Sequence, residues 1–503
     1  MLSVVDNRPF PVAPRAFNLA GHVLARADRF GDRPALTLLG PDGDETLSFA
    51  QLTRLTQGAA TALSAFGLVP GDRVLLRLGN SLAFPILFLG ALWAGLVPVP
   101  TSAALTGREI TRLSALVTPR LVVADPGIAL PDMPIPCLSP DLATWAELPP
   151  APLHLGDPGR EAYVIFTSGT SGQPTAVSHA HRAILARQSM HKHWEGLGEG
   201  DRIMHAGAFN WTYTLGTGLL DPWTLGATAL IPAAGTSAAD LPALLQRSRA
   251  TILAAAPGVY RQLLRNEMPP LPHLRHGLSA GEALLPALRD QWRARTGTDL
   301  HEALGMTEIS TYVSGSPDRP APEGSAGYVQ PGRHVAILGE ADTPLLRGEI
   351  GELAVSTEDP GLMRGYLGQP PPQGQWYRTG DVARMAADGA ITHLGRKDDL
   401  LNAGGFRVSP TEVEAAFQDC PGLQACAAVQ IEPRPGTTII ALFYEASCAI
   451  DENLLHQCAE KTLARWKQPR HYQRLDALPR TASATGTGKL IRKALAARYR
   501  RPE

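Results

Sequence analysis

The chain has 503 residues, of which 44% are hydrophobic and 18% are charged, and its 46 basic side chains balance 47 acidic ones. This composition excludes a disordered protein, and the near-neutral charge gives no general attraction to nucleic acid or anionic lipid. A chain of this length exceeds the core of one typical domain, so two or more domains are expected.

The cysteines and the N-terminus predict a cytoplasmic protein. The five cysteines are an odd number and form no C-x-x-C pair, which argues against a disulfide framework or a zinc site and favours a reducing compartment. The first 14 residues contain Asp6, Arg8 and three prolines, and they lack the continuous apolar core of a signal peptide.

The first 125 residues alternate between helix-like and strand-like patterns. Segments 47–66 and 86–93 indicate helices, and segments 73–78 and 121–124 indicate strands. Such alternation is typical of an α/β architecture with a parallel sheet.

Segment 82–100 is almost wholly apolar and by length could span a membrane. Pro85 and the Val-Pro-Val-Pro ending favour a buried helix that runs into a buried strand, and no membrane span is expected.

Residues 126–160 are proline-rich and predict a surface connection. A second α/β run follows, with strands expected near 203–206, 228–231 and 252–255. From 324 to 394, short β segments with Gly and Pro turns predict a small β barrel or sheet.

The charged stretch 395–399 is the strongest candidate for a domain boundary, since a helix at 410–417, strands near 425–430 and 438–444, and a helix at 452–466 follow it. We therefore expect an N-terminal domain over 1–394, a hinge at 395–399 and an α+β domain over 400–503.

The segment Phe166-Thr167-Ser168-Gly169-Thr170-Ser171-Gly172-Gln173-Pro174 follows an apolar run, 162–166, that indicates a strand. Glycines allow a tight turn, and hydroxyls and free N–H groups are donors to phosphate oxygens. The pattern predicts a loop that wraps a polyphosphate, although it is neither a Walker A loop nor a G-x-G-x-x-G turn. Taken alone, it could also be a polar surface turn.

Further motifs follow in a fixed order: Leu-Gly-Met-Thr-Glu at 304–308, Tyr-Arg-Thr-Gly-Asp at 377–381, Gly-Arg-Lys-Asp-Asp at 395–399, Gly-Gly-Phe-Arg-Val at 404–408 and Gly-Lys-Leu-Ile-Arg at 488–492. With the phosphate-type loop, this set resembles the adenylate-forming superfamily of acyl-CoA synthetases, adenylation domains and luciferases, most closely the benzoate-type acyl-CoA ligases. The resemblance runs from about residue 17 to 497. It implies two α/β subdomains and a small β barrel, followed by a smaller mobile α+β domain.

The resemblance implies an ATP-dependent acid–thiol ligase, an acyl-CoA synthetase that uses ATP, Mg²⁺ and CoA. A carboxylate attacks the α-phosphorus of ATP and releases pyrophosphate, and a thiolate then displaces AMP from the acyl-AMP. Positioning and charge neutralisation supply most of the catalysis in such transfers.

Site residues are carried over by resemblance. Asp381, with Arg396 nearby, would bind the ribose, and Thr307 would bond the α-phosphate. Glu308 would ligate Mg²⁺, a hard cation that prefers oxygen, although a surface carboxylate is the alternative. The adenine pocket would be lined by Ser279, Ala280, Gly281 and Glu282, and the β- and γ-phosphates would be held by Thr167, Ser168, Gly169, Thr170, Ser171 and Gly172.

The C-terminal motif implies that Lys489 bridges the substrate carboxylate and the α-phosphate, as a flexible ammonium can. The alternative is a solvated lysine. Asp398 matches the hinge about which the small domain rotates between the two half-reactions, and Gly404 and Gly405 would line a tunnel for the thiol.

The chain departs from the family pattern at three places. Thr175 stands where the phosphate loop usually has a lysine, Leu304 replaces a frequent tyrosine, and the segment 479–489 is about four residues longer than usual. A degenerate nucleotide-binding homologue with little catalysis therefore remains an alternative.

The segment around Trp211, Thr212 and Tyr213 lies where the family builds its acyl pocket, and it is similar to that of benzoate-type ligases. The two aromatic rings could wall a flat pocket or could be core residues. Asn210 is neutral, which argues against an amino-acid substrate. We expect a small aryl or short acyl acid, with CoA or a separate acyl carrier protein as acceptor.

Two rival interpretations are weaker. Gly277-Leu278-Ser279-Ala280-Gly281 matches the G-x-S-x-G nucleophile elbow of α/β hydrolases, but no strong strand precedes it. The pairs His179/His181 and His191/His193 suggest a metal, but residues two apart do not share a helix face.

Overall fold

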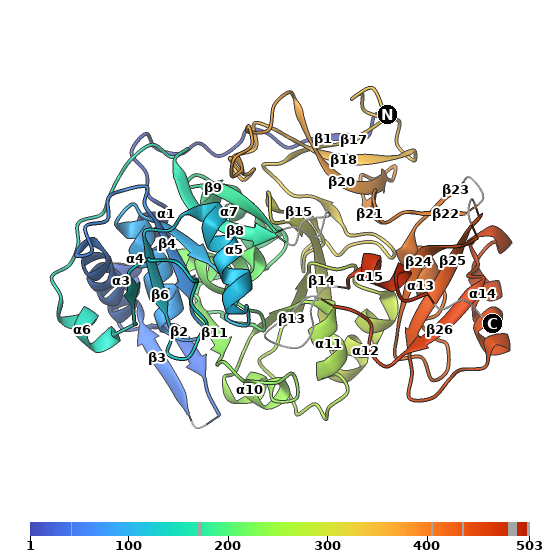
Figure 1. The fold of residues 1–503 in the computed structure, drawn as a ribbon, viewed down its shortest axis with the longest axis horizontal. Helices are drawn as coiled ribbons and strands as arrows, with labels where there is room; N and C mark the ends of the chain where they lie inside the picture. Colours follow the sequence, from blue (N-terminus) through green and yellow to red (C-terminus); the bar gives the residue numbers. More distant parts are fainter. Residues whose placement is uncertain (42, 168–173, 404–405, 435–436, 481–489, 500–503) are drawn as a thin grey trace.

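The computed structural model describes residues 1–41, 43–167, 174–403, 406–434, 437–480 and 490–499. Sheets with helices packed on them form the N-terminal part, an antiparallel sheet lies beside them, and a smaller α+β unit carries the C-terminus (Figure 1). This confirms the predicted fold class.

The first α/β unit contains a four-stranded parallel sheet. Helix α3 (Phe49–Ser64) begins after a capping box in which Ser48 and Gln51 accept hydrogen bonds from each other's backbone N–H groups. The strands are β4 (Arg73–Arg77), β5 (Val97–Pro100), β6 (Leu121–Ala124) and β7 (Cys137–Leu138), and the helices are α1 (Leu19–Val23), α2 (Ala27–Phe30), α3 (Phe49–Ser64), α4 (Ala83–Trp93) and α5 (Gly107–Val117).

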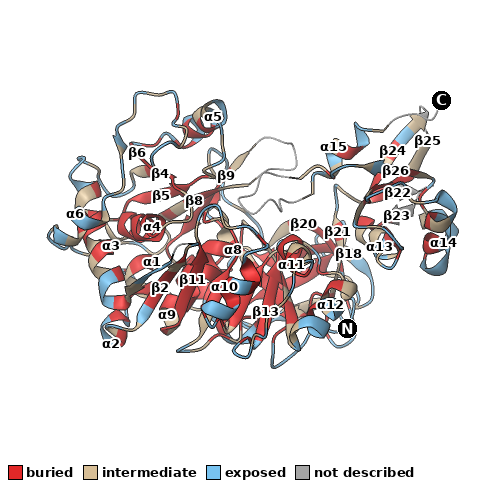
Figure 2. Ribbon diagram, turned by 90° about the horizontal axis from the view of Figure 1, so that it is seen from below, coloured by how far each residue is buried: buried red, intermediate tan, exposed pale blue. Residues whose placement is uncertain are grey.

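Helix α4 and strand β5 account for the long apolar segment. Residues 83–92 of the helix and all of the strand are buried, as Figure 2 shows for the helix, and a helix that is apolar all round belongs in a core. Among the described residues, the helices are too short or too polar to cross a membrane.

The proline-rich stretch is more than the predicted surface connection. It contains the helix α6 (Leu142–Glu147), and Trp145 within it is only 2% exposed. A Cβ at Gly58 of α3 would lie 1.9 Å from the Trp145 carbonyl oxygen, so the two helices touch through a glycine. Scattered prolines hid this packed turn from the sequence pattern.

The second α/β unit is built on a nine-stranded sheet with a parallel centre. Its strands, in chain order, are β2 (Pro34–Leu39), β3 (Asp44–Ser48), β10 (Arg202–His205), β11 (Thr228–Pro232), β12 (Ile252–Ala255), β13 (His276–Ala280), β14 (Asp299–Met306), β15 (Ser310–Ser314) and β16 (Tyr328–Val329). The helices between them are α7 (Ala183–His193), α8 (Thr212–Leu215), the π-helical turn Gly216–Leu220, α9 (Asp221–Leu225), α10 (Leu241–Arg247), α11 (Pro257–Leu263) and α12 (Pro286–Thr296).

This sheet rules out the hydrolase interpretation. Ser279 lies inside β13 and is fully buried, whereas a nucleophile elbow presents its serine on an exposed turn after a strand.

Two antiparallel sheets complete the N-terminal part. The hairpin β8 (Glu161–Thr167) and β9 (Thr175–Ala180) pairs with β19 (Gly365–Tyr366). The predicted β region is a five-stranded sheet made of β1 (Val4–Asp6), β17 (His334–Leu338), β18 (Ile350–Ser356), β20 (Trp376–Met385) and β21 (Ile391–Arg396).

The C-terminal unit has its own core, because two of its hydrophobic clusters contain only residues from Leu401 onward. Its elements are β22 (Leu401–Ala403), β23 (Phe406–Val408), α13 (Pro410–Ala415), β24 (Ala425–Arg434), β25 (Thr437–Glu445), α14 (Glu452–Thr462), a 3₁₀ turn (Arg465–Lys467), β26 (His471–Leu475) and α15 (Arg492–Ala496). The helix expected over 452–466 therefore ends earlier. All five cysteines are free thiols, and Cys137 and Cys448 are exposed.

Candidate active site

Asp381 lies opposite Arg396 in the pairing of β20 with β21. Its Oδ1 is 3.3 Å from Arg396 Nη1 and 3.2 Å from His393 Nε2. Burial would raise the pKa of this carboxyl, but His393 and then Arg396 outweigh it and hold the pKa below its usual range. Asp381 is therefore a buried carboxylate, and its Oδ2 makes no hydrogen bond with the described residues.

Gly380 allows this arrangement. Its φ is +76°, and a Cβ there would lie 2.7 Å from Arg396 Nη2. A side chain at this position would therefore displace the guanidinium from Asp381.

Glu308 lies in the turn between β14 and β15, and two tyrosines from other strands surround it. Tyr366 donates a hydrogen bond to Glu308 Oε1 at 2.8 Å, and its hydroxyl is 3.3 Å from that of Tyr377. Burial raises the pKa of Tyr366, and Glu308 adds to that shift. Among the described residues, the Tyr366 bond to Oε1 is the hydrogen bond that the Glu308 side chain makes.

Tyr377 connects the two carboxylates. Burial, followed by the charges of Glu308 and Asp381, raises the pKa of Tyr377 to about 12. The Tyr366 hydroxyl, which bonds Glu308, also lies 3.3 Å from the Tyr377 hydroxyl, and Tyr377 and Asp381 belong to the same strand, β20, so Glu308 lies next to the strand that carries Asp381.

Several of the predicted residues lie at one edge of the nine-stranded sheet. Strands β13 and β14 are parallel neighbours, and Gly281 follows the first while Thr307 follows the second. In such sheets, ligands bind beyond the carboxyl ends of the strands. Thr167 ends β8 and pairs with Thr175 at the base of the hairpin. The other predicted phosphate-loop residues, Ser168, Gly169, Thr170, Ser171 and Gly172, lie outside the described residues.

The expected adenine segment contacts Trp211. Gly281 has a φ of +94°, and a Cβ there would lie 2.7 Å from the indole ring. Ser279 and Ala280 are buried in β13, and Glu282 is 3.7 Å from Arg261 and 4.0 Å from Arg480. The last contact joins this edge to the C-terminal unit.

The three residues expected in the acyl pocket have different environments. Tyr213 is 7% exposed, donates a hydrogen bond to the Leu278 carbonyl at 3.1 Å, and lies edge-on to Trp211 with ring centroids 5.2 Å apart. Thr212 lines a small cavity that also reaches Thr307. Contact of Trp211 and Tyr213 with a substrate stays a prediction.

The expected hinge follows β21. Asp398 is exposed in a turn, and the Lys397 N–H donates to the Gly380 carbonyl at 2.8 Å, which ties this turn to the Asp381 strand. Gly404, Gly405 and Lys489 lie outside the described residues.

Sequence reasoning missed a buried ion pair beside the cavity. Arg187 Nε donates to Asp221 Oδ1 at 3.0 Å, Nη2 bonds Oδ2, and His191 Nε2 is 3.3 Å from Oδ1. Glu195 lies beside them, and burial and then Asp221 raise its pKa well above the usual range. The sequence signal that could have indicated this ion pair was the presence of charged residues inside apolar segments, because a buried charge requires a partner.

His191, Glu195 and Asp221 offer ligand atoms within 4.8 Å of one another. Both Asp221 oxygens already bond Arg187, so the acceptor atoms of this carboxylate are used by a buried ion pair. His193 is exposed, and the metal interpretation of the histidine pairs remains unsupported.

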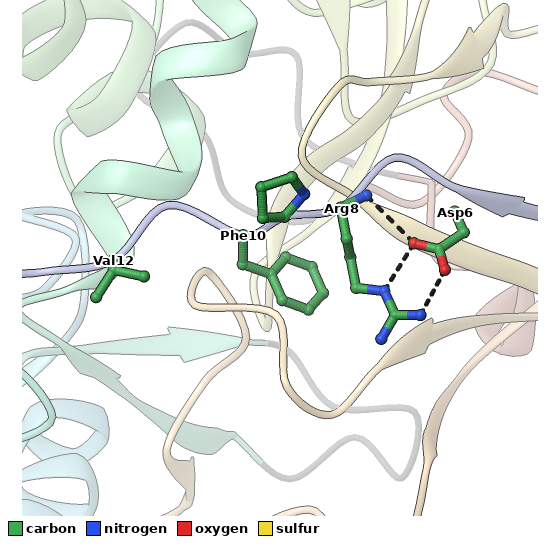
Figure 3. Close-up of a pocket in the computed structure, with 5 residues that line it drawn as sticks. Asp6, Arg8, Phe10 and Val12 are labelled. Atoms are coloured by element: carbon green, nitrogen blue, oxygen red, sulfur yellow. Dashed lines mark hydrogen bonds and ion pairs between the residues drawn. The ribbon is translucent and has the colours of Figure 1, made fainter.

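A separate surface depression lies along the N-terminal segment (Figure 3). Asp6, Arg8, Phe10 and Val12 line it, and Arg8 Nε donates to Asp6 Oδ1 at 2.7 Å. None of the residues predicted for the active site lines this depression.

Comparison with known proteins agrees with this geometry. The family model for the AMP-binding enzymes matches residues 23–367. A 3-hydroxybenzoate/4-hydroxybenzoate–CoA ligase of Thauera aromatica is 28% identical over 95% of this chain and 96% of its own length. A 4-hydroxybenzoate/benzoate–CoA ligase of Rhodopseudomonas palustris is 29% identical over 90% and 89%.

Solved structures give the same result. A benzoate CoA ligase from Burkholderia xenovorans superposes with a TM-score of 0.85 at 26% identity, covering 95% of this chain and 100% of that one. An anthranilate CoA ligase in complex with anthranoyl-AMP gives a TM-score of 0.86 at 25% identity, with 97% and 98% covered.

The chain belongs to the AMP-binding enzyme family. The resemblance to the adenylate-forming superfamily, and to benzoate-type acyl-CoA ligases in particular, is thereby confirmed, as is the expectation of an ATP-dependent ligase.

Proposed function

We propose that this protein adenylates a small carboxylic acid, aryl or short acyl, and transfers the acyl group to CoA. The observation that carries the proposal is the chain of contacts from Glu308 through Tyr366 to Tyr377, which lies in the strand that holds Asp381, next to the strand end that bears Thr307. The names of the relatives, which are benzoate– and hydroxybenzoate–CoA ligases, support an aryl acid and CoA.

Each residue has a role that its surroundings support. Asp381 would accept hydrogen bonds from the ribose hydroxyls through its free Oδ2, since His393 and Arg396 occupy Oδ1. Thr307 would donate to the α-phosphate. Glu308 has carboxylate oxygens that fit a Mg²⁺ ion, which supplies charge neutralisation at the phosphates when bound.

The first half-reaction forms a bond between a carboxylate oxygen and the α-phosphorus and breaks the bond to pyrophosphate. In the second, a thiolate attacks the acyl carbon and AMP leaves. Lys489 would act in the first half-reaction. The domain over 400–503 would then rotate about the hinge at 395–399, with Asp398 at its centre, and this rotation would allow the second half-reaction. The separate hydrophobic core beyond residue 400 supports that division.

The test is pyrophosphate release from a panel of acids, with and without CoA. We expect turnover with small aryl or short acyl acids, and thioester formation with CoA. Activity restricted to long-chain acids or amino acids would contradict the proposed substrate. Transfer only to an acyl carrier protein would contradict CoA as acceptor, and ATP binding without acyl-AMP formation would indicate a degenerate homologue.

A further inference from the structure

Thr307 and Glu308 lie in a short turn, residues 307–309, that joins β14 to β15. Met306 and Ser310 pair with each other across the two strands, and the Ile309 N–H donates to the Met306 carbonyl at 3.2 Å. The places of the Thr307 hydroxyl and the Glu308 carboxylate therefore depend on how the residues that close this turn are held.

Ser310 closes the turn in a left-handed backbone conformation, with a φ of +70°. Glycine and asparagine adopt this region readily, but the Cβ of a serine makes it unfavourable. A residue in such a conformation persists only where its surroundings hold it there. We therefore looked for the group that holds Ser310.

Helix α7 supplies that group. Arg187 Nη1 donates to Ser310 Oγ, and the Ser310 hydroxyl in turn donates to the Met190 sulfur at 3.9 Å. These two bonds use the hydroxyl both as an acceptor and as a donor. The side chain of Ser310 is therefore anchored to the helix on the C-terminal side of turn 307–309.

Arg187 is itself fixed in place. It is only 7% exposed, its Nε donates to Asp221 Oδ1 at 3.0 Å, and its Nη2 bonds both Asp221 Oδ2 and, at 3.2 Å, Thr217 Oγ1. A bidentate pair with a carboxylate keeps the guanidinium plane in one orientation. A Cβ at Gly216 would lie 2.1 Å from Arg187 Cζ, so the chain leaves room for the guanidinium by using glycine there.

Other contacts support the first two residues of the turn. The Met363 N–H donates to the Glu308 carbonyl at 2.7 Å. His179 of β9, in the wall of the small cavity that reaches Thr307, hydrogen-bonds the Thr307 backbone. Both bonds act on one flank of the turn, and the anchor on helix α7 acts on the other.

We propose that Arg187 is a positioning residue: it holds Ser310 in the left-handed conformation and so sets the geometry of turn 307–309. Thr307 and Glu308 are thereby oriented toward the α-phosphate and its magnesium ion. The inference rests on the proposed function, which gives the turn these roles. Because Asp221 neutralises the guanidinium, the effect passes through geometry and not through charge.

Removing the pair should weaken nucleotide binding mainly when the metal is present. Arg187→Met combined with Asp221→Leu leaves no lone buried charge. We expect the Kd for ATP with magnesium, measured by isothermal titration calorimetry, to rise about 10-fold in this double variant, because the metal ligand is misplaced. The Kd for ATP in EDTA should change by about 3-fold or less, since only a neutral hydrogen bond is affected. General damage to the site would weaken both.

Glycine at position 310 supplies the rescue. Because glycine adopts a positive φ without help, adding Ser310→Gly to the double variant should return the Kd for ATP with magnesium to within about 3-fold of the wild-type value. A pair that only stabilised the core would not be replaced by this third change. The matched control, Arg73→Met with Glu161→Leu, removes a partly buried pair, 2.8 Å apart, at the end of β8 away from Thr167, and should keep the wild-type Kd.

Pyrophosphate release should follow the binding data, with a fall of about 10- to 100-fold in the double variant and recovery with glycine. An unchanged Kd for ATP with magnesium in the double variant, or a loss that glycine does not restore, overturns the inference and leaves the proposed function intact. Binding that follows the expected pattern without pyrophosphate release from any acid overturns the proposed function and leaves the link between the pair and the turn in place.

If circular dichroism shows that the double variant fails to fold, two single variants decide. Ser310→Ala removes the hydroxyl but keeps the unfavourable Cβ, whereas Ser310→Gly removes both. The alanine variant should therefore raise the Kd for ATP with magnesium more than the glycine variant does. Equal Kd values for the two variants would overturn the inference.

Discussion

Arg396 and Asp381 face each other across two antiparallel strands, and the arginine Nη1 that lies 3.3 Å from the carboxylate also donates to the Thr379 carbonyl at 2.6 Å. The guanidinium is therefore fixed by backbone as well as by charge. It orients Asp381 while the second carboxylate oxygen stays available to a ligand.

Replacing Asp381 by Asn should raise the KM for ATP by about 10-fold or more, because a charge-assisted acceptor for the ribose is lost. The measurement is the ATP dependence of pyrophosphate release. Asp342→Asn is a matched control, since Asp342 also pairs with an arginine, Arg378, but is 71% exposed at the surface of the same sheet region. An unchanged KM in Asp381→Asn would contradict the ribose role.

Glu308→Gln should lower the adenylation rate by about 100-fold and shift its magnesium dependence to higher concentration, because a neutral amide is a poorer ligand for a hard cation. The readout is a magnesium titration of single-turnover acyl-AMP formation. Tyr366→Phe should have a smaller effect in the same direction, since it removes only the hydrogen bond that orients the carboxylate. Glu349→Gln, at an exposed position, is the control; a normal magnesium curve for Glu308→Gln would reject the assignment.

Lys489→Ala should abolish adenylation but spare thioester formation from supplied acyl-AMP, because in the proposed role the lysine would bridge the carboxylate and the α-phosphate only in the first half-reaction. Both half-reactions are measured separately on the same preparation. Lys493→Ala on α15 serves as the comparison and should retain both. Equal loss of both half-reactions would contradict a hinge that exchanges the lysine for the thiol.

Four buried histidines should make the free energy of unfolding depend on pH. Burial lowers the pKa of His179 and His301 to about 4 and those of His181 and His205 to about 3. An unfolded histidine takes up a proton near pH 6.5, so below that pH the unfolded state binds more protons and stability falls as pH decreases. The slope approaches about 1.4 kcal/mol per pH unit for each histidine.

Urea unfolding at pH 7.5 and 5.5 measures this loss. His205→Leu should reduce the pH dependence by the share of one histidine, and His193→Leu, at an exposed position, should leave it unchanged. A stability that is flat over this range would mean that the folded rings are protonated.

The sequence predicted the elements whose pattern is local. The predicted bounds of helix α4 and strand β6 agree with the observed ones to within a few residues, because a continuous apolar run is stable only when it is buried in the core. The motifs around Thr307 and Asp381 were recognisable because their residues are adjacent in the chain. Trp145 was missed because prolines on both sides mask a single buried turn.

The partners of the site residues could not be predicted. Tyr366 is 58 residues from Glu308, and Asp221 is 34 residues from Arg187, so only the folded sheets bring them together. The same holds for His179, whose cavity forms from a hairpin, a helix and a strand of another sheet. Periodicity reports which residues are buried, but it does not report what they face.

The distribution of the thiols offers a direct view of motion in this enzyme. Cys137 and Cys448 are exposed, Cys420 and Cys458 are buried, and the exposed pair lies on opposite sides of residues 395–399. Maleimide dyes would therefore attach preferentially at one native position on each side of that link. Energy transfer between the two fluorophores would follow any rotation during turnover without an engineered cysteine.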